Sequence, residues 1–191
     1  VGAGGAGFPA YAKMTEKADT VILNCVECEP LLKLHRQLLA THTEEIIQML
    51  DEVRESFGAK EAVIGIKSEY VTTIKAIEEV IGDFPNVRIC ALKAAYPMGD
   101  EVVLIYEATG RVIKPGGLPI DENVVVYNVE TMYNLYRAVH LNIPVTNKLV
   151  SIVGEIDHPL TVRVPLGTTV KEAISLAGKI TVEDPAYVMG L

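Results

Sequence analysis

Short apolar runs rich in β-branched residues alternate along this chain with longer segments whose apolar residues recur at helical spacing. The first pattern is typical of buried strands and the second of helices that cover them. The predicted strands span 20–24, 62–66, 87–92 and 124–127, and the predicted helices span 31–57, 70–81, 100–108 and 128–141. The longest of these helices can equally be two consecutive ones. Strands that alternate with helices predict an α/β fold, in which a parallel sheet carries helices on both faces.

The pattern changes near Pro144. Residues 149–155 and 161–164 alternate apolar and polar side chains, as the two strands of a hairpin do. A helix from Thr168 or Thr169 to Gly178 is expected next, because a threonine is a good N-terminal cap and a glycine a common C-terminal one. An apolar stretch after it predicts one further strand. Such a short unit predicts a small β-grasp module, so we expect domains over 1–147 and 148–191.

Composition excludes several classes of protein. The chain has 17 basic and 25 acidic side chains and a formal net charge of −8, so it lacks the basic surface of a general nucleic-acid binder. Its 49% of apolar residues can form a packed core. No apolar run approaches the ~20 residues of a membrane span, and no signal peptide is recognisable. Three cysteines, an odd number, argue against a disulfide framework and favour a reducing compartment, so we expect a cytoplasmic protein.

Both ends of the sequence stop inside a pattern. The chain opens without Met on a glycine-rich loop, and it closes on an apolar stretch that runs into Gly190. A glycine-rich loop needs preceding structure to position it. We therefore expect this chain to be a piece of a longer protein.

The opening loop, GAGGAGFP, is the first candidate for a binding site. Its glycines are Gly2, Gly4, Gly5 and Gly7. Glycines let backbone N–H groups approach a ligand closely, and such loops ahead of a helix cradle phosphate groups. Pro9 suits the first helical turn, and Lys13 follows one turn later, where it could neutralise a phosphate. The alternative is a flexible or tag-derived N-terminus.

A second polar cluster follows the first strand directly, in the sequence ILNCVECEP. Asn24, Glu27 and Glu29 would lie at the carboxyl end of that strand, where ligands of parallel sheets bind. Carboxylates there need a hydrogen-bonding ligand or a cation, and they could accept from ribose hydroxyls or lie beside a redox ring. The alternative is that Glu27 and Glu29 are first-turn carboxylates that favour the helix dipole.

The same segment contains a CxxC pair, Cys25 and Cys28. In a cytosolic α/β protein this spacing is a candidate for thiol redox chemistry, because a helix N-terminus lowers the pKa of a thiol. As a metal site it is incomplete, since Cys90 is the only other cysteine and the histidines show no ligand-like spacing. We therefore expect no metal site formed wholly by this chain.

Two further clusters lie at strand-to-helix junctions. Gly99, Asp100 and Glu101 follow the third strand and open a helix. Asn128 follows the fourth strand, where it could be an N-terminal cap supported by Glu130 or Thr131. In a parallel sheet all these junctions meet at the edge formed by the carboxyl ends of the strands.

The motifs GAGGAGFPAYAK, ILNCVECEP, YPMGDE and YNVET, in this order, resemble those of the flavin- and NADH-binding subunit of respiratory complex I and its relatives. Within that superfamily the chain is most similar to RnfC-like electron-transfer proteins, which include cobalamin reductase and proline reductase-associated types. The resemblance covers essentially the whole chain. It implies a Rossmann-like domain that binds FMN, followed by a β-grasp module of the SLBB type.

The resemblance also implies roles for single residues. The glycine loop and Lys13 would hold the FMN phosphate, and the residues of the next three motifs would line the flavin and nicotinamide pocket. The implied cofactor-binding residues are Gly2, Gly4, Gly5, Gly7, Lys13, Asn24, Tyr96, Gly99, Asp100, Asn128 and Thr131. The implied catalytic residues, which orient the nicotinamide and tune the flavin, are Glu27, Glu29 and Glu101.

The implied reaction is hydride transfer from NADH to FMN, followed by electron transfer to iron–sulfur clusters or a partner reductase. The chain contains no CxxCxxCxxxCP stretch, so any 4Fe-4S clusters are expected in a C-terminal segment outside it. Val26 and Tyr127 stand where complex I proteins have aspartate and asparagine. Expected partners are NADH and other electron-transfer subunits, with membrane association only through a complex. Two alternatives are a docking module without flavin and a thiol oxidoreductase that uses Cys25 and Cys28.

Overall fold

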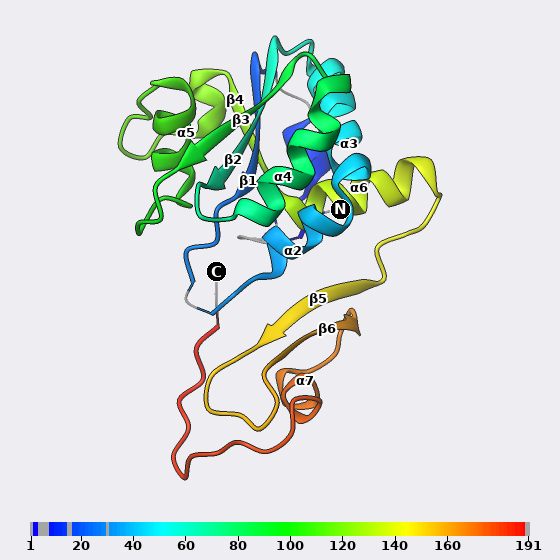
Figure 1. Cartoon of the computed structure of the whole chain (residues 1–191), viewed down its shortest axis with the longest axis vertical. Coiled ribbons are helices and arrows are strands. Elements are labelled where there is room, and N and C mark those ends of the chain that lie inside the picture. The colour runs from blue at the N-terminus through cyan, green and yellow to red at the C-terminus, as the bar shows by residue number, and fades with distance from the viewer. Residues whose placement is uncertain (1, 4–7, 15–16, 30, 190–191) are drawn as a thin grey trace.

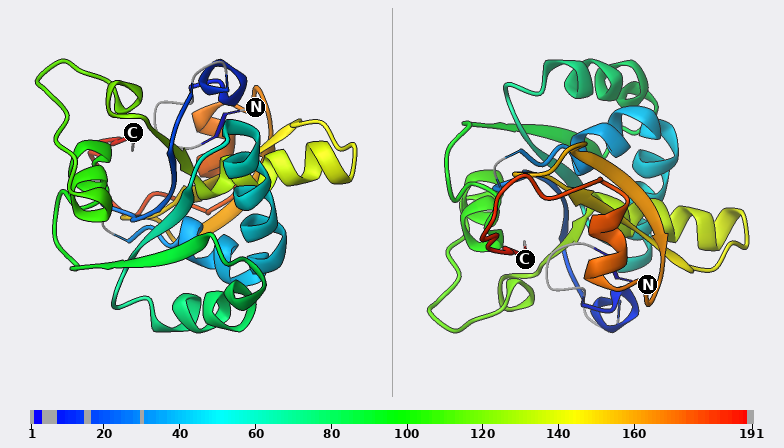
Figure 2. Two further views of the ribbon diagram at one scale, coloured as in Figure 1. Left: turned by 90° about the horizontal axis from the view of Figure 1, so that it is seen from above. Right: turned by 90° about the horizontal axis from the view of Figure 1, so that it is seen from below.

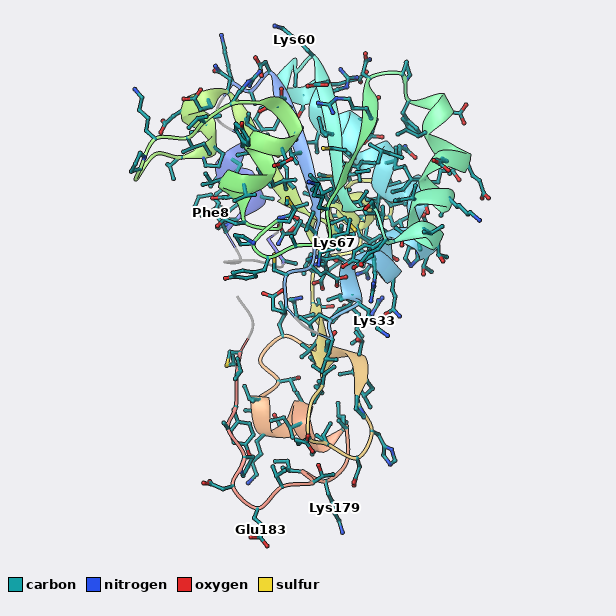
Figure 3. The ribbon with its side chains drawn as sticks, turned by 60° about the vertical axis from the view of Figure 1, so that its left-hand side comes forward. Phe8, Lys33, Lys60, Lys67, Lys179 and Glu183 are labelled. Atoms are coloured by element: carbon teal, nitrogen blue, oxygen red, sulfur yellow. The ribbon has the colours of Figure 1, made fainter. Side chains whose placement is uncertain are left out.

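The computed structural model describes residues 2–3, 8–14, 17–29 and 31–189. Figure 1 shows a four-stranded sheet with helices packed around it, and a smaller part with two strands and a short helix. Figure 3 places Lys67, at the carboxyl end of a sheet strand, toward the smaller part, and Lys60 at the opposite end of the sheet. The carboxyl ends of the sheet strands therefore face the smaller part.

All four strands of the larger sheet are parallel. They are β1 (Thr20–Cys25), β2 (Glu61–Lys67), β3 (Val87–Leu92) and β4 (Val124–Asn128), in the spatial order β3-β2-β1-β4. Each lies within two residues of its predicted position. The first strand of the chain thus lies inside the sheet, with β2 on one side and β4 on the other.

The larger part contains six helices among the described residues. They are α1 (Ala10–Lys13), α2 (Leu34–Thr41), α3 (Thr43–Phe57), α4 (Val71–Val80), α5 (Glu101–Thr109) and α6 (Val129–His140). Two short 3-10 helices, η1 (Ile81–Asp83) and η2 (Pro119–Glu122), precede β3 and β4. The predicted segment 31–57 is two helices, because His42 leaves the helical conformation between them.

Helices cover both faces of the sheet, as predicted, and Figure 2 shows the two layers in the view from above. Successive strand residues point to opposite faces. Val21, Leu23 and Cys25 therefore join the larger core with α2, α3 and α6. Ile22 joins a smaller core with Leu104 and its neighbours on α5. This two-sided burial explains the nearly continuous apolar strands of the sequence.

The smaller part consists of β5 (Asn147–Ile152), β6 (Leu160–Pro165) and α7 (Val170–Ser175). The strands pair in the antiparallel direction, as the hairpin-like pattern predicts. Thr169 caps α7, since its hydroxyl accepts from Glu172 N and the Glu172 carboxylate accepts from Thr169 N.

The predicted strand after α7 is wrong for the described residues. Outside the named strands, the described residues form only an isolated antiparallel bridge between Ile156 and Ile180. Pro185 has no N–H for a strand ladder, and Tyr187 and Val188 stay exposed rather than packing on a second layer. The boundary between 147 and 148 stays a prediction, and β5 begins right beside it, at Asn147.

None of the helices in the described ranges is long and apolar enough to cross a membrane.

Candidate functional site

The chain connections of the sheet diverge at the carboxyl ends of β1 and β4. From β1 the chain builds β2 and β3 on one side, then crosses to β4 on the other side. Ligands of parallel sheets bind where the connections diverge in this way. Asn24 and Asn128 are register partners at this point, so two of the predicted site residues lie side by side. Asn128 precedes α6, and its side chain forms no cap hydrogen bond, which leaves its amide available.

Lys13 brings a positive charge beside the middle of β4. It is the last residue of α1, and its Nζ donates to the carbonyl oxygen of Val126 at 2.7 Å. The Nζ also lies 5.4 Å from the ring centroid of Tyr127. Burial lowers the pKa of the Lys13 ammonium, and the negative charge of Glu101 opposes that shift. The predicted residues Lys13 and Glu101 are thus close enough to interact electrostatically.

Thr131 ties the N-terminal loop to α6. Its hydroxyl accepts from Ala3 N at 2.9 Å and donates to the Ala3 carbonyl oxygen at 2.6 Å. Thr131 is buried, and Gly2 lies next to the anchored residue. Gly4, Gly5 and Gly7, which are predicted to bind phosphate, lie outside the described residues.

The turn before α5 packs directly on the end of β1. Asn24 Nδ2 donates to the Gly99 carbonyl oxygen at 2.9 Å, and Gly99 N donates to Cys28 Sγ at 3.0 Å. A Cβ at position 99 would overlap the Val26 carbonyl oxygen and lie 2.7 Å from Cys28 Sγ. Only glycine fits this approach. Gly99 therefore joins the second motif to the third.

Three predicted residues of the third motif have different surroundings. Asp100 is the N-terminal cap of α5, and its Oδ1 accepts from Val102 N at 2.9 Å. Glu101 is exposed at the first position of the same helix. Tyr96 is 84% exposed. The structure therefore gives Asp100 a helix-capping role that the sequence analysis did not consider.

The Glu27 carboxylate points to the start of α2. Its Oε1 accepts from His35 N at 2.9 Å, and its Oε2 lies 3.8 Å from Arg36 Nε. Glu27 is only 6% exposed, and burial raises the pKa of its carboxyl group, opposed by the bond from His35 N and by Arg36. Glu27 is not in the first helical turn, as the helix-dipole alternative predicts, but precedes α2 and accepts from its first turn. Glu29, half-buried, lies on the same segment.

The two cysteines of the CxxC pair lie in different surroundings. Cys25 is fully buried in the core beneath α2 and α3, and burial raises the pKa of its thiol, which disfavours the reactive thiolate. Cys28 lies against Gly99 instead. Both thiols are free. The geometry therefore argues against a reactive dithiol at this site. No group of three or more candidate metal ligands gathers among the described residues.

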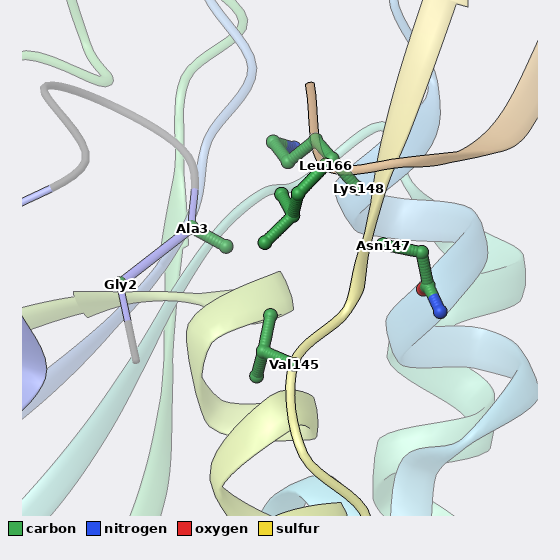
Figure 4. A pocket seen from close by; sticks show the side chains of 6 residues that line it. All are labelled: Gly2, Ala3, Val145, Asn147, Lys148 and Leu166. Atoms are coloured by element: carbon green, nitrogen blue, oxygen red, sulfur yellow. The ribbon is translucent and has the colours of Figure 1, made fainter. Parts of the chain in front are cut away.

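Two features near the site are not indicated by the sequence pattern. The first is the role of Glu130, which the pattern offers only as a support for the Asn128 cap, and whose buried carboxylate binds Lys148 Nζ and accepts from Leu149 N at 2.9 Å. The second is a pocket of about 360 Å³ shown in Figure 4, which is lined by Gly2, Ala3, Val145, Asn147, Lys148 and Leu166. No local pattern could have found either, because the partners come from distant segments. A carboxylate in a first helical turn is ordinarily explained by the helix dipole alone.

Comparison with known proteins places the chain in a family. Residues 1–137 match the Nuo51 FMN-binding domain, and residues 149–186 match the SLBB domain. The chain is 40% identical over 190 residues to the cobalamin reductase PduS of Citrobacter freundii. It is 30% identical over 195 residues to one component of the Na(+)-translocating ferredoxin:NAD(+) oxidoreductase complex of Acetobacterium woodii. Both alignments cover 100% of this chain but only 42% and 44% of the relatives, so the chain spans less than half of their length.

A solved structure has the same fold. It is the NAD+-reducing [NiFe]-hydrogenase in the H2-reduced state, with a TM-score of 0.75 and 25% sequence identity over 92% of this chain and 36% of that chain. The fold, the ordered motifs and the two matched domains agree with one another. The chain therefore belongs to the Nuo51 FMN-binding domain family, as an RnfC-like member in which an SLBB domain follows the FMN-binding domain.

Proposed function

We propose that this chain binds FMN at the carboxyl ends of β1 and β4 and is the flavin-dependent electron-transfer unit of a longer oxidoreductase. The observation that carries the proposal is the divergence of the connections at the carboxyl ends of β1 and β4, where Asn24 and Asn128 lie in register. The Lys13 ammonium lies beside β4, where it donates to the Val126 carbonyl oxygen. A polar floor beside a positive charge suits a ligand with a polar ring and a phosphate.

The described residues fit such a cofactor. Burial disfavours the charged form of Lys13, and an anionic phosphate nearby would stabilise it. We assign the phosphate to Lys13 and to the loop glycines Gly2, Gly4, Gly5 and Gly7. Within this loop, Ala3 is held by its hydrogen bonds with Thr131. We assign the ring to Asn24, Tyr96, Gly99, Asp100 and Asn128.

Bound FMN supplies the redox chemistry, because flavins accept two electrons as hydride and release them singly. The side chains orient the reactants and set the local charge. Glu101 favours the protonated form of Lys13. Glu27 fixes the segment after β1 by accepting from the first turn of α2. We propose that Glu27 and Glu29 orient the nicotinamide beside the bound flavin.

The relatives suggest the electron donor and acceptor. Their names describe a ferredoxin:NAD(+) oxidoreductase, an NAD+-reducing hydrogenase and a cobalamin reductase. We propose NADH as the hydride donor of this chain. Electrons would leave for iron–sulfur clusters or a partner reductase, in parts of the whole protein that this chain does not cover. We propose a cytoplasmic site of action, with membrane contact only through a complex.

The test is an FMN titration of the purified chain, followed by NADH addition without oxygen. Flavin binding with bleaching of its visible absorbance would support the NADH:FMN half-reaction. Binding without bleaching would retain the cofactor and overturn NADH as donor. Absence of binding in a chain shown to be folded would overturn the proposal and favour a docking module of an electron-transfer complex.

A further inference from the structure

The first turn of α6 holds two segments that are far apart in the sequence. Thr131 exchanges two hydrogen bonds with the backbone of Ala3, in the N-terminal loop. Its neighbour Glu130 binds the start of β5, through Leu149 N at 2.9 Å and through Lys148 Nζ. One helical turn thus joins the glycine loop to the smaller part of the molecule.

The carboxylate of Glu130 is buried, which makes its contacts strong constraints. Glu130 is 2% exposed. A buried carboxylate must be paired and hydrogen-bonded, and removal of either partner leaves a costly charge. Leu149 also packs against the larger core, so its backbone bond to Glu130 lies beside an apolar contact. The start of β5 is therefore docked by a charge, a backbone bond and a side chain together.

The pocket of about 360 Å³ lies between the two segments that this turn holds. Gly2 and Ala3 line one side of it, and Val145, Asn147, Lys148 and Leu166 line the other (Figure 4). Gly2 and Ala3 therefore face the start of β5 and Leu166 across this pocket.

His35 lies near the contact between Glu130 and Lys148 and can serve as a probe of it. It lies in the first turn of α2, and its N–H donates to Glu27. Burial, and next the positive charge of Lys148, lower the pKa of His35 to about 4. Lys148 therefore lies close enough to the start of α2 for its charge to be felt there.

We propose that Glu130 is a positioning residue, which docks the start of β5 on the first turn of α6 and thereby holds Ala3, the N-terminal residue that Thr131 anchors on that turn. Loss of the Glu130 contacts would loosen both segments together. The expected change in flavin affinity rests on the proposed function. The positioning of the two segments by Glu130 does not depend on the proposed function.

The test uses Glu130→Ala, which removes both contacts, and Glu130→Gln, which keeps an acceptor for Leu149 N and loses the ion pair. Glu52→Gln is the matched control, because Glu52 Oε2 pairs with His140 Nε2 at 2.8 Å at the far end of α6. Residue-resolved amide exchange is measured at Leu149 and Ala3, and the pKa of His35 is measured by NMR titration. FMN affinity is measured for the same proteins.

We expect Glu130→Ala to speed exchange at both amides by about tenfold or more, since a docked segment then opens locally. The pKa of His35 should rise as Lys148 moves away. FMN affinity should fall by roughly tenfold, with partial recovery in Glu130→Gln, as expected for coupled neighbours. The control should match the wild type in every readout. If Glu130→Ala does not fold, the same comparisons are made with Glu130→Gln.

Two results would overturn the proposal. Unchanged exchange at Leu149 would show that Glu130 does not dock β5. Faster exchange at Leu149 with unchanged exchange at Ala3 and unchanged FMN affinity would show that docking and loop position are independent. A wild type that binds no FMN would refute the proposed function alone, because the two amides and His35 still decide whether Glu130 positions the loop.

Discussion

At the residue scale, the site depends on side chains whose polar atoms are already committed to the protein. The Asn24 amide holds the turn at Gly99 through Nδ2 and accepts from Val26 N through Oδ1. Asp100 caps a helix, and Glu27 binds the start of another. These residues would act on a ligand mainly by fixing the backbone around it, whereas Lys13 and Asn128 have polar groups that can reach a ligand.

Gly99→Ala is expected to destabilise the protein and to weaken flavin binding. The added methyl group would overlap the Val26 carbonyl oxygen, a backbone atom that cannot move aside cheaply. Overpacking of this kind costs about 1–3 kcal/mol. Urea unfolding measures the loss. Gly82→Ala is the control, because a Cβ there meets nothing within 4 Å, and an equal loss in that variant would contradict the steric argument.

Lys13→Met is expected to weaken FMN binding while the fold is retained. The substitution keeps the apolar stem over the Tyr127 ring and removes the charge. A hydrogen bond to a charged group contributes about 1.5–3 kcal/mol, so affinity should fall by roughly one to two powers of ten. Fluorescence titration with FMN measures it. Lys17→Met, at an exposed lysine of the same segment, should bind like the wild type. Equal affinities for Lys13→Met and the wild type would remove Lys13 from the site.

At the scale of elements, the beginnings of α2 and α6 are the junctions of the molecule. The start of α2 donates to a side chain that precedes the helix, and the start of α6 carries a side chain that accepts from a strand. Glu27 accepts from the first turn of α2, and Glu130, in the first turn of α6, accepts from β5. These helices are positioned through their first turns, close to the carboxyl edge of the sheet. The site and the contact with the smaller part are therefore built from the same backbone.

The start of α2 should make stability depend on pH. The pKa of His35 is lowered to about 4, below its ordinary value of 6.5, so between these values the unfolded state holds a proton that the folded state lacks. The free energy of unfolding therefore rises with pH across this window. Acidification from pH 6.5 toward pH 4 lowers the free energy of unfolding, at up to about 1.4 kcal/mol per pH unit.

The check is urea unfolding at several pH values between 4 and 7. His35→Gln should flatten this part of the curve, because the titrating group is gone. His158→Gln, at an exposed histidine of the smaller part, should keep the wild-type slope. A curve for His35→Gln that parallels the wild type would assign the pH dependence to other groups.

At the scale of the whole molecule, the two parts differ in how many apolar side chains they bury. The larger part buries both faces of its sheet. Among the described residues after 146, only Val164, Ala173 and Ala177 are buried apolar side chains. A two-stranded hairpin with so little core is marginal by itself, so the smaller part depends on its contacts with the larger one.

The isolated segment 147–189 is accordingly expected to be unfolded in water. Circular dichroism should show no cooperative transition on heating, whereas the same residues in the whole chain should be protected from amide exchange. The segment 17–141 is the matched control, since it contains every buried residue of both cores except Ala10 and should unfold cooperatively. A cooperative transition in the isolated segment 147–189 would show that the smaller part has a stable core of its own.

Most of the fold follows from local pattern. The strands at 20–25 and 61–67 follow from the sequence because β-branched apolar runs buried on both faces have few other stable arrangements. The sequence pattern does not decide whether 31–57 is one helix or two, since the apolar spacing continues through His42. The strand expected after α7 fails because an apolar stretch needs a neighbouring strand to pair with, and the described residues pair there only at the single bridge between Ile156 and Ile180.

The location of the candidate site follows from the amino-acid order alone, because four polar or glycine-rich motifs follow strands and the carboxyl ends of parallel strands share one edge. The contacts of each polar side chain depend instead on tertiary packing. Glu27 and Glu130 look alike as acidic residues at helix starts, yet one binds a backbone N–H eight residues away and the other a strand 18 and 19 residues away. Local pattern cannot encode such partners, since they meet only when separate elements pack.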